Sequence, residues 1–245
     1  MARFFASMAA GLPVIPGEML DYYLSQGYYR MQQDLFTCRF LPREGQLNTV
    51  HWLRIVLPQV QYGPKQRRLL RLNERFSVLV KPLRLTAEYE ALYARYRQNL
   101  DFDTSASLEA LLLDGATHTV FRTEIVEVRD QGQLIAAGIL DAGSDSIAGI
   151  VNFYDPDYRK FSLGKYLLLL KIEYARAEQL AYYYPGYLVH GYPKFDYKLW
   201  ACPAATEVFN SRTHHWRPFS WDDVNRQAAA LRTERLAQDL AEEAE

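Results

Sequence analysis

The part of the sequence that constrains the fold most is the succession of apolar runs after residue 119. Runs at 120–129, 133–140 and 146–154 are separated by Asp-Gln-Gly and Gly-Ser-Asp, which favour turns, so they predict three antiparallel strands. An apolar stretch at 162–179 predicts a long helix, and the tyrosine-rich run at 181–189 predicts a fourth strand. This β-β-β-α-β order predicts an α+β fold.

The sharp loop before the long helix is the first candidate binding site. A helix N-terminus has backbone N–H groups without partners, and its dipole favours anionic groups. Ser162, Leu163 and Gly164 open this helix, and Gly164 has no side chain to keep a ligand away from those groups. The alternative is an ordinary serine cap followed by a glycine that permits close packing. The strand order and this loop resemble the core of the acyl-CoA N-acyltransferases, which holds an activated acyl donor against the helix N-terminus.

The first half of the chain predicts smaller elements around this core. They are a helix at 16–26, an antiparallel meander of strands at 28–32, 35–41 and 49–57, a basic amphipathic helix from Pro64, a strand at 77–85, and helices at 86–99 and 105–113. Residues 1–17 predict a weakly ordered lead-in that is not a signal peptide. We therefore expect an N-terminal region at 1–60, an acyltransferase-like core at 61–220 and a charged C-terminal helix at 221–245.

Charge and cysteine content limit the function classes. A net charge of −1 over 245 residues excludes a uniformly basic nucleic-acid binder but allows a local basic patch. The densest basic run opens the helix that starts at Pro64, and its members are Lys65, Gln66, Arg67, Arg68 and Arg71. Two cysteines cannot form a disulfide framework, which fits a reducing cytoplasm. No window approaches the ~18 apolar residues of a membrane span.

Four motifs carry a resemblance to a known family. They are Asn-Phe-Tyr-Asp-Pro at 152–156, Ser-Leu-Gly-Lys-Tyr at 162–166, Tyr-Tyr-Tyr-Pro-Gly-Tyr at 182–187 and Pro-Lys-Phe-Asp-Tyr-Lys at 193–198. Together they resemble the C-terminal core of arginyl-tRNA–protein transferases and, equally, of bacterial relatives that use leucyl-tRNA to modify N-terminal Asp or Glu. That family has FxDP, SLG, GY and PKMxYK motifs in this order, and an Asp where Asp141 lies. The resemblance covers about residues 16 to 205.

One departure from the family concerns metal binding. Family members usually have a cysteine cluster before the basic helix, which serves a metal or iron–sulfur centre. Here Cys38 is the single cysteine of that segment, and one thiol cannot hold such a centre even with His51 nearby. We therefore expect no metal and no cofactor, with aminoacyl-tRNA as the co-substrate.

The resemblance implies aminolysis of an ester. A protein α-amine attacks the aminoacyl carbonyl and the 3′-terminal hydroxyl of the tRNA leaves, so no covalent enzyme intermediate is needed. The enzyme has to orient both reactants, keep the amine neutral and stabilise the tetrahedral oxyanion. We expect arginine first, and leucine second, to be transferred to N-terminal Asp or Glu of proteins or peptides.

Site residues follow from the resemblance, motif by motif. Those assigned to catalysis are Asp141, Tyr154, Asp155 and Tyr197. Those assigned to substrate binding are Lys194, Lys198, Tyr187, Ser162, Leu163 and Gly164. The two aspartates would hold an amino group and the two lysines an acidic side chain or a phosphate, while Tyr154 and Tyr187 would stack on the terminal adenine. The basic run at 65–71 would bind the tRNA acceptor stem. Turn formation, core packing and a solvated helix face are the competing interpretations.

Two other function classes stay open. An acyl-CoA N-acyltransferase is opposed by a poor match to the pyrophosphate loop Q/R-x-x-G-x-G/A, because Arg159, Ser162 and Gly164 supply one glycine where two are expected. The other class is a non-catalytic tRNA- or degron-binding protein of the same fold. The sequence leaves open which amino acid is transferred, whether the acceptor is a protein or a small peptide, and the oligomeric state.

Overall fold

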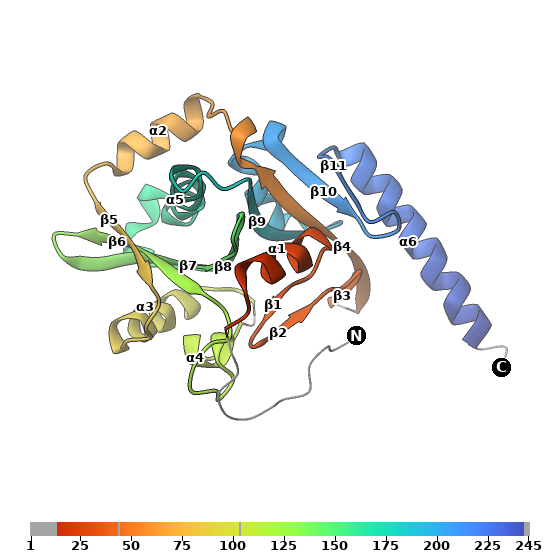
Figure 1. Ribbon diagram of the computed structural model, residues 1–245, viewed down its shortest axis with the longest axis horizontal. Coiled ribbons are helices and arrows are strands. Elements are labelled where there is room, and N and C mark those ends of the chain that lie inside the picture. The colour runs from red at the N-terminus through yellow and green to blue at the C-terminus, as the bar shows by residue number, and fades with distance from the viewer. Residues whose placement is uncertain (1–13, 44, 103, 243–245) are drawn as a thin grey trace.

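A single large sheet organises the computed structural model, which describes residues 14–43, 45–102 and 104–242 (Figure 1). Along this sheet the strands lie in the order β11-β10-β4-β9-β8-β7-β6-β5, and β3 pairs with the end of β4. Helices cover both faces. The expected lead-in falls mostly on residues 1–13, which lie outside the described residues.

The β-β-β-α-β core predicted from the sequence is present. Strands β6 (Thr123–Asp130), β7 (Gln133–Ala142) and β8 (Ser146–Tyr154) are antiparallel neighbours. The 3₁₀ helix η2 (Pro156–Phe161) leads into α5 (Leu163–Ala177), and β9 (Tyr182–Val189) returns parallel to β8. The mixed architecture and the strand order expected of an acyltransferase-like core are therefore confirmed.

The parallel pair β8 and β9 separates after a short contact. Their register covers only Ser146–Ala148 against Tyr182–Tyr184, and further along β9 pairs with β4 (Gln46–Val56) instead. The Tyr29 hydroxyl lies at the point of separation, where it donates to the carbonyls of Gly149 and, at 3.0 Å, of Tyr184. The second half of β8 is thus left without a strand neighbour on its β9 side, which opens space beneath the start of α5.

The N-terminal region differs from the expected meander. Helix α1 (Gly17–Ser25) is followed by a separate hairpin of β1 (Tyr29–Met31) and β2 (Asp34–Phe36). Strand β3 (Phe40–Arg43) then pairs with β4, and β4 lies between β9 and β10 in the large sheet. The reason is burial: residues 49–53 of β4 are all buried, as in a strand covered on both faces. Strand β4 precedes the expected boundary at residue 60.

The remaining elements cover the two faces of the sheet. Helix α2 (Pro64–Asn73) packs with α5 on one face, while α3 (Ala87–Arg97) and α4 (Leu108–Leu112) lie on the other, around Tyr93 and Phe153 (Figure 1). Thr86 and Ser107 cap α3 and α4 through their side chains, as their residue types favour. The other elements are η1 (Leu57–Gln59), β5 (Ser77–Pro82), η3 (Pro193–Trp200), η4 (Pro203–Ala205), β10 (Thr206–Asn210), β11 (His215–Pro218) and α6 (Trp221–Glu242). None of the helices in the described ranges is both long and apolar enough to span a membrane.

Candidate active site

A cavity of about 550 Å³ lies where β8 ends and α5 begins. Its walls come from η2, the first turn of α5, η3 and the segment at 96–102. Six of the residues assigned from the sequence line it, namely Tyr154, Ser162, Gly164, Lys194, Tyr197 and Lys198. The structure therefore brings together residues from three of the four motifs, and we call this cavity the cleft.

The start of α5 is shaped by its first residues. Ser162 adopts a left-handed conformation with φ of 49°, and its side chain makes no capping hydrogen bond, so it is not the ordinary serine cap. Leu163 is fully buried and anchors the turn. A Cβ at Gly164 would lie 3.2 Å from Cε1 of Tyr154, so the glycine gives the Tyr154 ring room to pack over the helix start. Ser162, Gly164 and Lys165 of this first turn line the cleft.

The two lysines of the fourth motif lie in different surroundings. Lys194 is exposed at the cleft mouth, where it forms an ion pair with Asp101. Lys198 is only 7% exposed, and its Nζ lies 4.6 Å from the ring centre of Phe195 and 4.8 Å from that of Tyr197. Burial lowers the pKa of Lys198 to about 7, although the nearby Asp196 carboxylate acts in the opposite direction. A carboxylate entering the cleft would favour the charged form of Lys198.

The aromatic side chains around Lys198 form one wall. Tyr187 stacks on Phe195 at 5.3 Å between ring centres and lies 5.8 Å from Lys198 Nζ, although Tyr187 itself does not line the cleft. Tyr197 is 43% exposed. Tyr96 and Tyr154 also line the cleft and lie 5.0 Å apart, centre to centre. The cleft thus offers aromatic surfaces, which suit an adenine ring or an aliphatic side chain.

The two aspartates assigned to catalysis do not line the cleft. Asp141 is completely buried, accepts hydrogen bonds from Arg30 at 2.8 Å and Thr123 at 2.7 Å, and lies on β7. Asp155 caps η2 by accepting from the Asp157 N–H and pairs with Arg95 at 2.8 Å. Both side chains hold neighbouring elements in place. The two aspartates therefore support the structure around the cleft. The sequence had instead predicted that they bind an amino group of a substrate.

The basic residues of α2 lie on the surface beside the cleft. Lys65, Arg67, Arg68 and Arg71 are exposed, while Gln66 is half-buried and donates to the Trp200 carbonyl at 2.5 Å. Helix α2 packs against η2 and α5, where three further basic side chains are exposed: Arg159, Lys160 and Lys165. Arg159 and Lys165 also line the cleft. These residues form a basic track, which we define as the exposed cations of α2 together with Arg159, Lys160 and Lys165.

Sequence reasoning missed several cleft residues. Arg43 and Tyr96 line the cleft but belong to segments with no motif, so no signal pointed to them. Asn152 stands inside the first family motif, yet only its neighbours were assigned a role. Arg159 and Lys165 flank the SLG motif, and their charge was the available signal.

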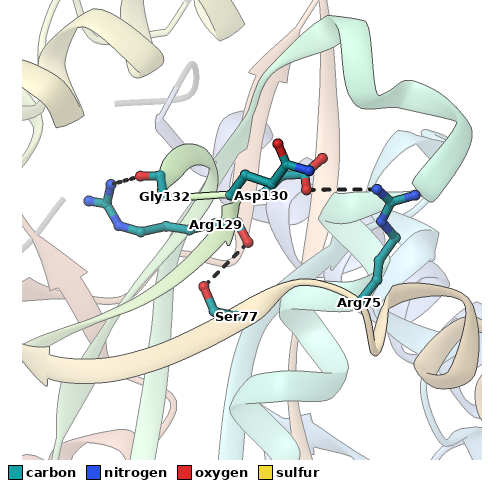
Figure 2. A pocket seen from close by; sticks show the side chains of 6 residues that line it. Arg75, Ser77, Arg129, Asp130 and Gly132 are labelled. Carbon is teal, nitrogen blue, oxygen red and sulfur yellow. Dashed lines mark hydrogen bonds and ion pairs between the residues drawn. The ribbon is translucent and has the colours of Figure 1, made fainter.

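A second hollow, at the turn between β6 and β7, contains none of the assigned residues. Figure 2 shows Arg129 donating to the Gly132 carbonyl and Arg75 facing Asp130, at 3.8 Å. Arg129 also forms a two-pronged ion pair with Glu88, at 2.6 and 2.9 Å. Each charged side chain that lines this hollow therefore already has an ion-pair partner.

Metal-binding side chains do not gather anywhere in the described ranges, where no three His, Cys, Asp or Glu residues form a site. Cys38 is half-buried, and burial raises the pKa of its thiol to about 11. His51 is buried next to Thr49, at 3.0 Å from its hydroxyl. The expectation that the protein needs no metal stays a prediction.

Comparison with known proteins agrees with the motifs. Residues 88–205 match the family described as "Arginine-tRNA-protein transferase, C terminus". The aspartate/glutamate leucyltransferase of Leptospira interrogans is 29% identical over 210 residues, which cover 82% of this chain and 79% of that protein. The protein of the same name from Hahella chejuensis is 30% identical over 187 residues, which cover 73% and 77%. Among solved structures, FemX aligns with a TM-score of 0.48 and 9% identity over 77% of this chain and 65% of that chain. With the four motifs in order and three of them meeting in one cleft, the chain belongs to the family of aminoacyl-tRNA–protein transferases and is an aminoacyltransferase.

Proposed function

We propose that this enzyme moves leucine from leucyl-tRNA to the N-terminal amine of proteins or peptides that begin with Asp or Glu. The observation that carries the proposal is the cleft itself, which has a buried lysine on one wall and a basic track leading to its mouth. The proposed reaction consumes charged tRNA and so belongs in the cytoplasm.

Leucine is favoured over arginine by the lining of the cleft. An arginyl side chain needs a carboxylate partner, and the lining carboxylate, Asp101, is already paired with Lys194. The rest of the lining consists of cations, aromatic rings such as Tyr96 and Phe195, and uncharged residues. An aliphatic side chain can pack on these rings without an unpaired charge. The names of the similar bacterial enzymes point the same way.

The acidic acceptor residue is assigned to Lys198. Its amine is almost buried, so a carboxylate that reaches it is shielded from water and the interaction is stronger than at an exposed lysine. Lys194 lies further out and already has Asp101 as a partner. We therefore assign recognition of the acceptor side chain to Lys198 and give Lys194 at most a role at the entrance.

The tRNA is assigned to the basic track. Contacts between phosphates and exposed Lys or Arg side chains do not depend on sequence, which suits an enzyme that binds an acceptor stem. Arg159 and Lys165 lie at both the track and the cleft, so they would guide the 3′ end inward. Tyr154 and Tyr96 then offer a surface on which the terminal adenine can stack.

The chemical step is a direct aminolysis that forms no covalent bond to the enzyme. The neutral α-amine attacks the ester carbonyl and a C–N bond forms; collapse of the tetrahedral intermediate then breaks the C–O bond to the tRNA 3′-oxygen, which takes up the proton that the attacking nitrogen loses. We propose that the enzyme works without a cofactor or metal; elemental analysis of active protein that finds one metal per chain would contradict this.

The test is a transfer assay with radiolabelled leucyl-, arginyl- and phenylalanyl-tRNA against peptides that begin with Asp, Glu, Arg or Ala. We expect label from leucyl-tRNA on the Asp and Glu peptides only. Transfer from arginyl-tRNA alone would contradict the choice of leucine. Acetyl-CoA serves as a control ligand, and its binding in the micromolar range, measured by thermal stabilisation, would favour an acyl-CoA enzyme.

A further inference from the structure

Asn152 lies on the floor of the cleft and has no role in the scheme above. It belongs to β8 and pairs across the sheet with Gly138 of β7. Side chains alternate along a strand, and the neighbouring Phe153 packs on the opposite face against Tyr93. Asn152 therefore points to the α5 face, on the part of β8 that has lost its β9 neighbour.

The amide of Asn152 is unused within the described part of the chain. Its Oδ1 is shielded from solvent and has no hydrogen-bond partner there. Buried polar groups are nearly always hydrogen-bonded, and leaving one unpaired costs about 1–3 kcal/mol. The Nδ2 group has no hydrogen bond among the described residues either but, unlike Oδ1, it is not fully shielded, so it is the end of the amide that a substrate in the cleft can reach.

Two neighbours fix the position of Asn152. A Cβ on Gly138 would lie 2.8 Å from Asn152 Oδ1 and 2.9 Å from Cε of Lys171, so the glycine leaves just enough room for both side chains. Lys171 comes from α5, is 1% exposed, and donates to the carbonyls of Ile139 at 2.7 Å and Val151 at 3.4 Å. The lysine thereby holds the backbone immediately before Asn152 and the strand beside it.

The surroundings also orient the amide. Oδ1 lies on the inner side, near the end of the Lys171 side chain, where the amino group presents N–H groups and an amide oxygen is favoured over an amide NH₂. The Nδ2 end is then directed to the cleft, which makes Asn152 a hydrogen-bond donor there. In the proposed reaction the group that most needs a donor is the carbonyl oxygen, because it gains negative charge when the amine attacks.

We propose that Asn152 is a catalytic residue that donates a hydrogen bond to the oxyanion of the tetrahedral intermediate, and that Lys171 is the positioning residue behind it. The inference rests on the proposed aminoacyl transfer. As the C–N bond forms, the carbonyl electron pair moves to oxygen and the Asn152 N–H binds it; when the C–O bond to the tRNA breaks, the pair returns and the hydrogen bond weakens.

The test separates chemistry from binding. Single-turnover leucine transfer to an Asp-starting peptide is measured at saturating enzyme, alongside the Kd for leucyl-tRNA whose ester is replaced by a stable amide. We expect Asn152→Ala and Asn152→Asp to reduce the rate about 100- to 1,000-fold, with Kd changed less than threefold. Asn152→Ser, whose hydroxyl can still donate, should be intermediate and guards against misfolding of the alanine variant. Asn225→Ala, on α6, is the matched control and should keep the wild-type rate.

Lys171→Met tests the positioning role. It should slow the same step without changing Kd, and the double variant Lys171→Met/Asn152→Ala should be no slower than Asn152→Ala alone. Rates that multiply in the double variant would refute the link between the two residues. A wild-type rate in Asn152→Ala, or a loss confined to Kd, would overturn the catalytic role while wild-type transfer still supports the proposed function. Absence of transfer by the wild-type enzyme would overturn both.

Discussion

Replacing Lys198 by Met tests the acceptor site with two measurements. Activity toward Asp-starting peptides should fall, while stability at neutral pH should rise. Methionine keeps an apolar stem of similar length among Phe195 and Tyr187 but removes the amine. A charged hydrogen bond in a partly desolvated site contributes roughly 1.5–3 kcal/mol. Because about 1.4 kcal/mol is a factor of ten, kcat/KM for Asp-starting peptides should fall about 10- to 150-fold.

The same substitution should stabilise the fold at neutral pH. Burial lowers the pKa of Lys198 to about 7, whereas an unfolded lysine has a pKa of about 10.4. Between these values the unfolded chain binds a proton that the folded chain does not, so the free energy of unfolding rises with pH by about 1.4 kcal/mol per unit. At pH 7 the buried lysine therefore lowers the free energy of unfolding by up to about 4 kcal/mol. Lys198→Met should restore this stability, and the difference between the two proteins should vanish as the pH approaches about 10.

The assay compares peptides that begin with Asp or with its neutral isostere Asn, while urea unfolding at pH 7 and 10 reports stability. The Asp peptide should lose its advantage in Lys198→Met and keep it in Lys194→Met, because Lys194 is exposed and paired with Asp101. An equal loss for both peptides would show that Lys198 acts in the chemical step. Loss of discrimination in Lys194→Met alone would move the acceptor site to the cleft mouth.

Three further predictions concern other parts of the molecule. The triple variant Lys65→Ala/Arg67→Ala/Arg68→Ala should raise KM for leucyl-tRNA and flatten its dependence on salt, with peptide preference unchanged; altered peptide preference would contradict the tRNA assignment. Burial lowers the pKa of His51 to about 4, so between about pH 6.5 and 4 the unfolded state binds a proton that the folded state does not. The free energy of unfolding therefore decreases as the pH is lowered through this range. His51→Gln should reduce that slope in urea titrations by about 1.4 kcal/mol per unit, and an unchanged slope would refute the burial argument. Gly164→Ala places a Cβ 3.2 Å from Tyr154 and should displace the ring. We expect kcat/KM for leucyl-tRNA to fall about tenfold with Tm nearly unchanged. Wild-type kinetics would show that the Tyr154 ring does not define the donor site.

The sequence was most informative where local signals are strong. Turn residues bracket β8, and its predicted range of 146–154 matches the observed strand. The long helix was also predicted, because its apolar content and flanking signals are local. The hairpin of β10 and β11 was missed, since both strands are short and β10 pairs with β4, which lies about 150 residues earlier in the chain.

The site was less predictable because its contacts are long-range. Asp141 and Asp155 stood at motif positions, but their partners Arg30 and Arg95 lie 111 and 60 residues earlier in the chain. No spacing rule connects such residues before the sheet is assembled. The different burial of Lys194 and Lys198 likewise depends on which side of η3 faces Tyr187, which the motif alone does not determine.

The central place of β4 has a consequence for how the chain folds during synthesis. Val50 of β4 pairs with Val189 of β9, so β4 cannot complete its hydrogen bonds until most of the chain has left the ribosome. Contacts between distant segments slow folding and leave apolar strands exposed to aggregation meanwhile. The antiparallel β6, β7 and β8 need only their neighbours and can form earlier. We therefore expect the nascent chain to depend on chaperones. We also expect the matched segment 88–205 expressed alone to aggregate, since it lacks β4 and leaves that edge of β9 unpaired.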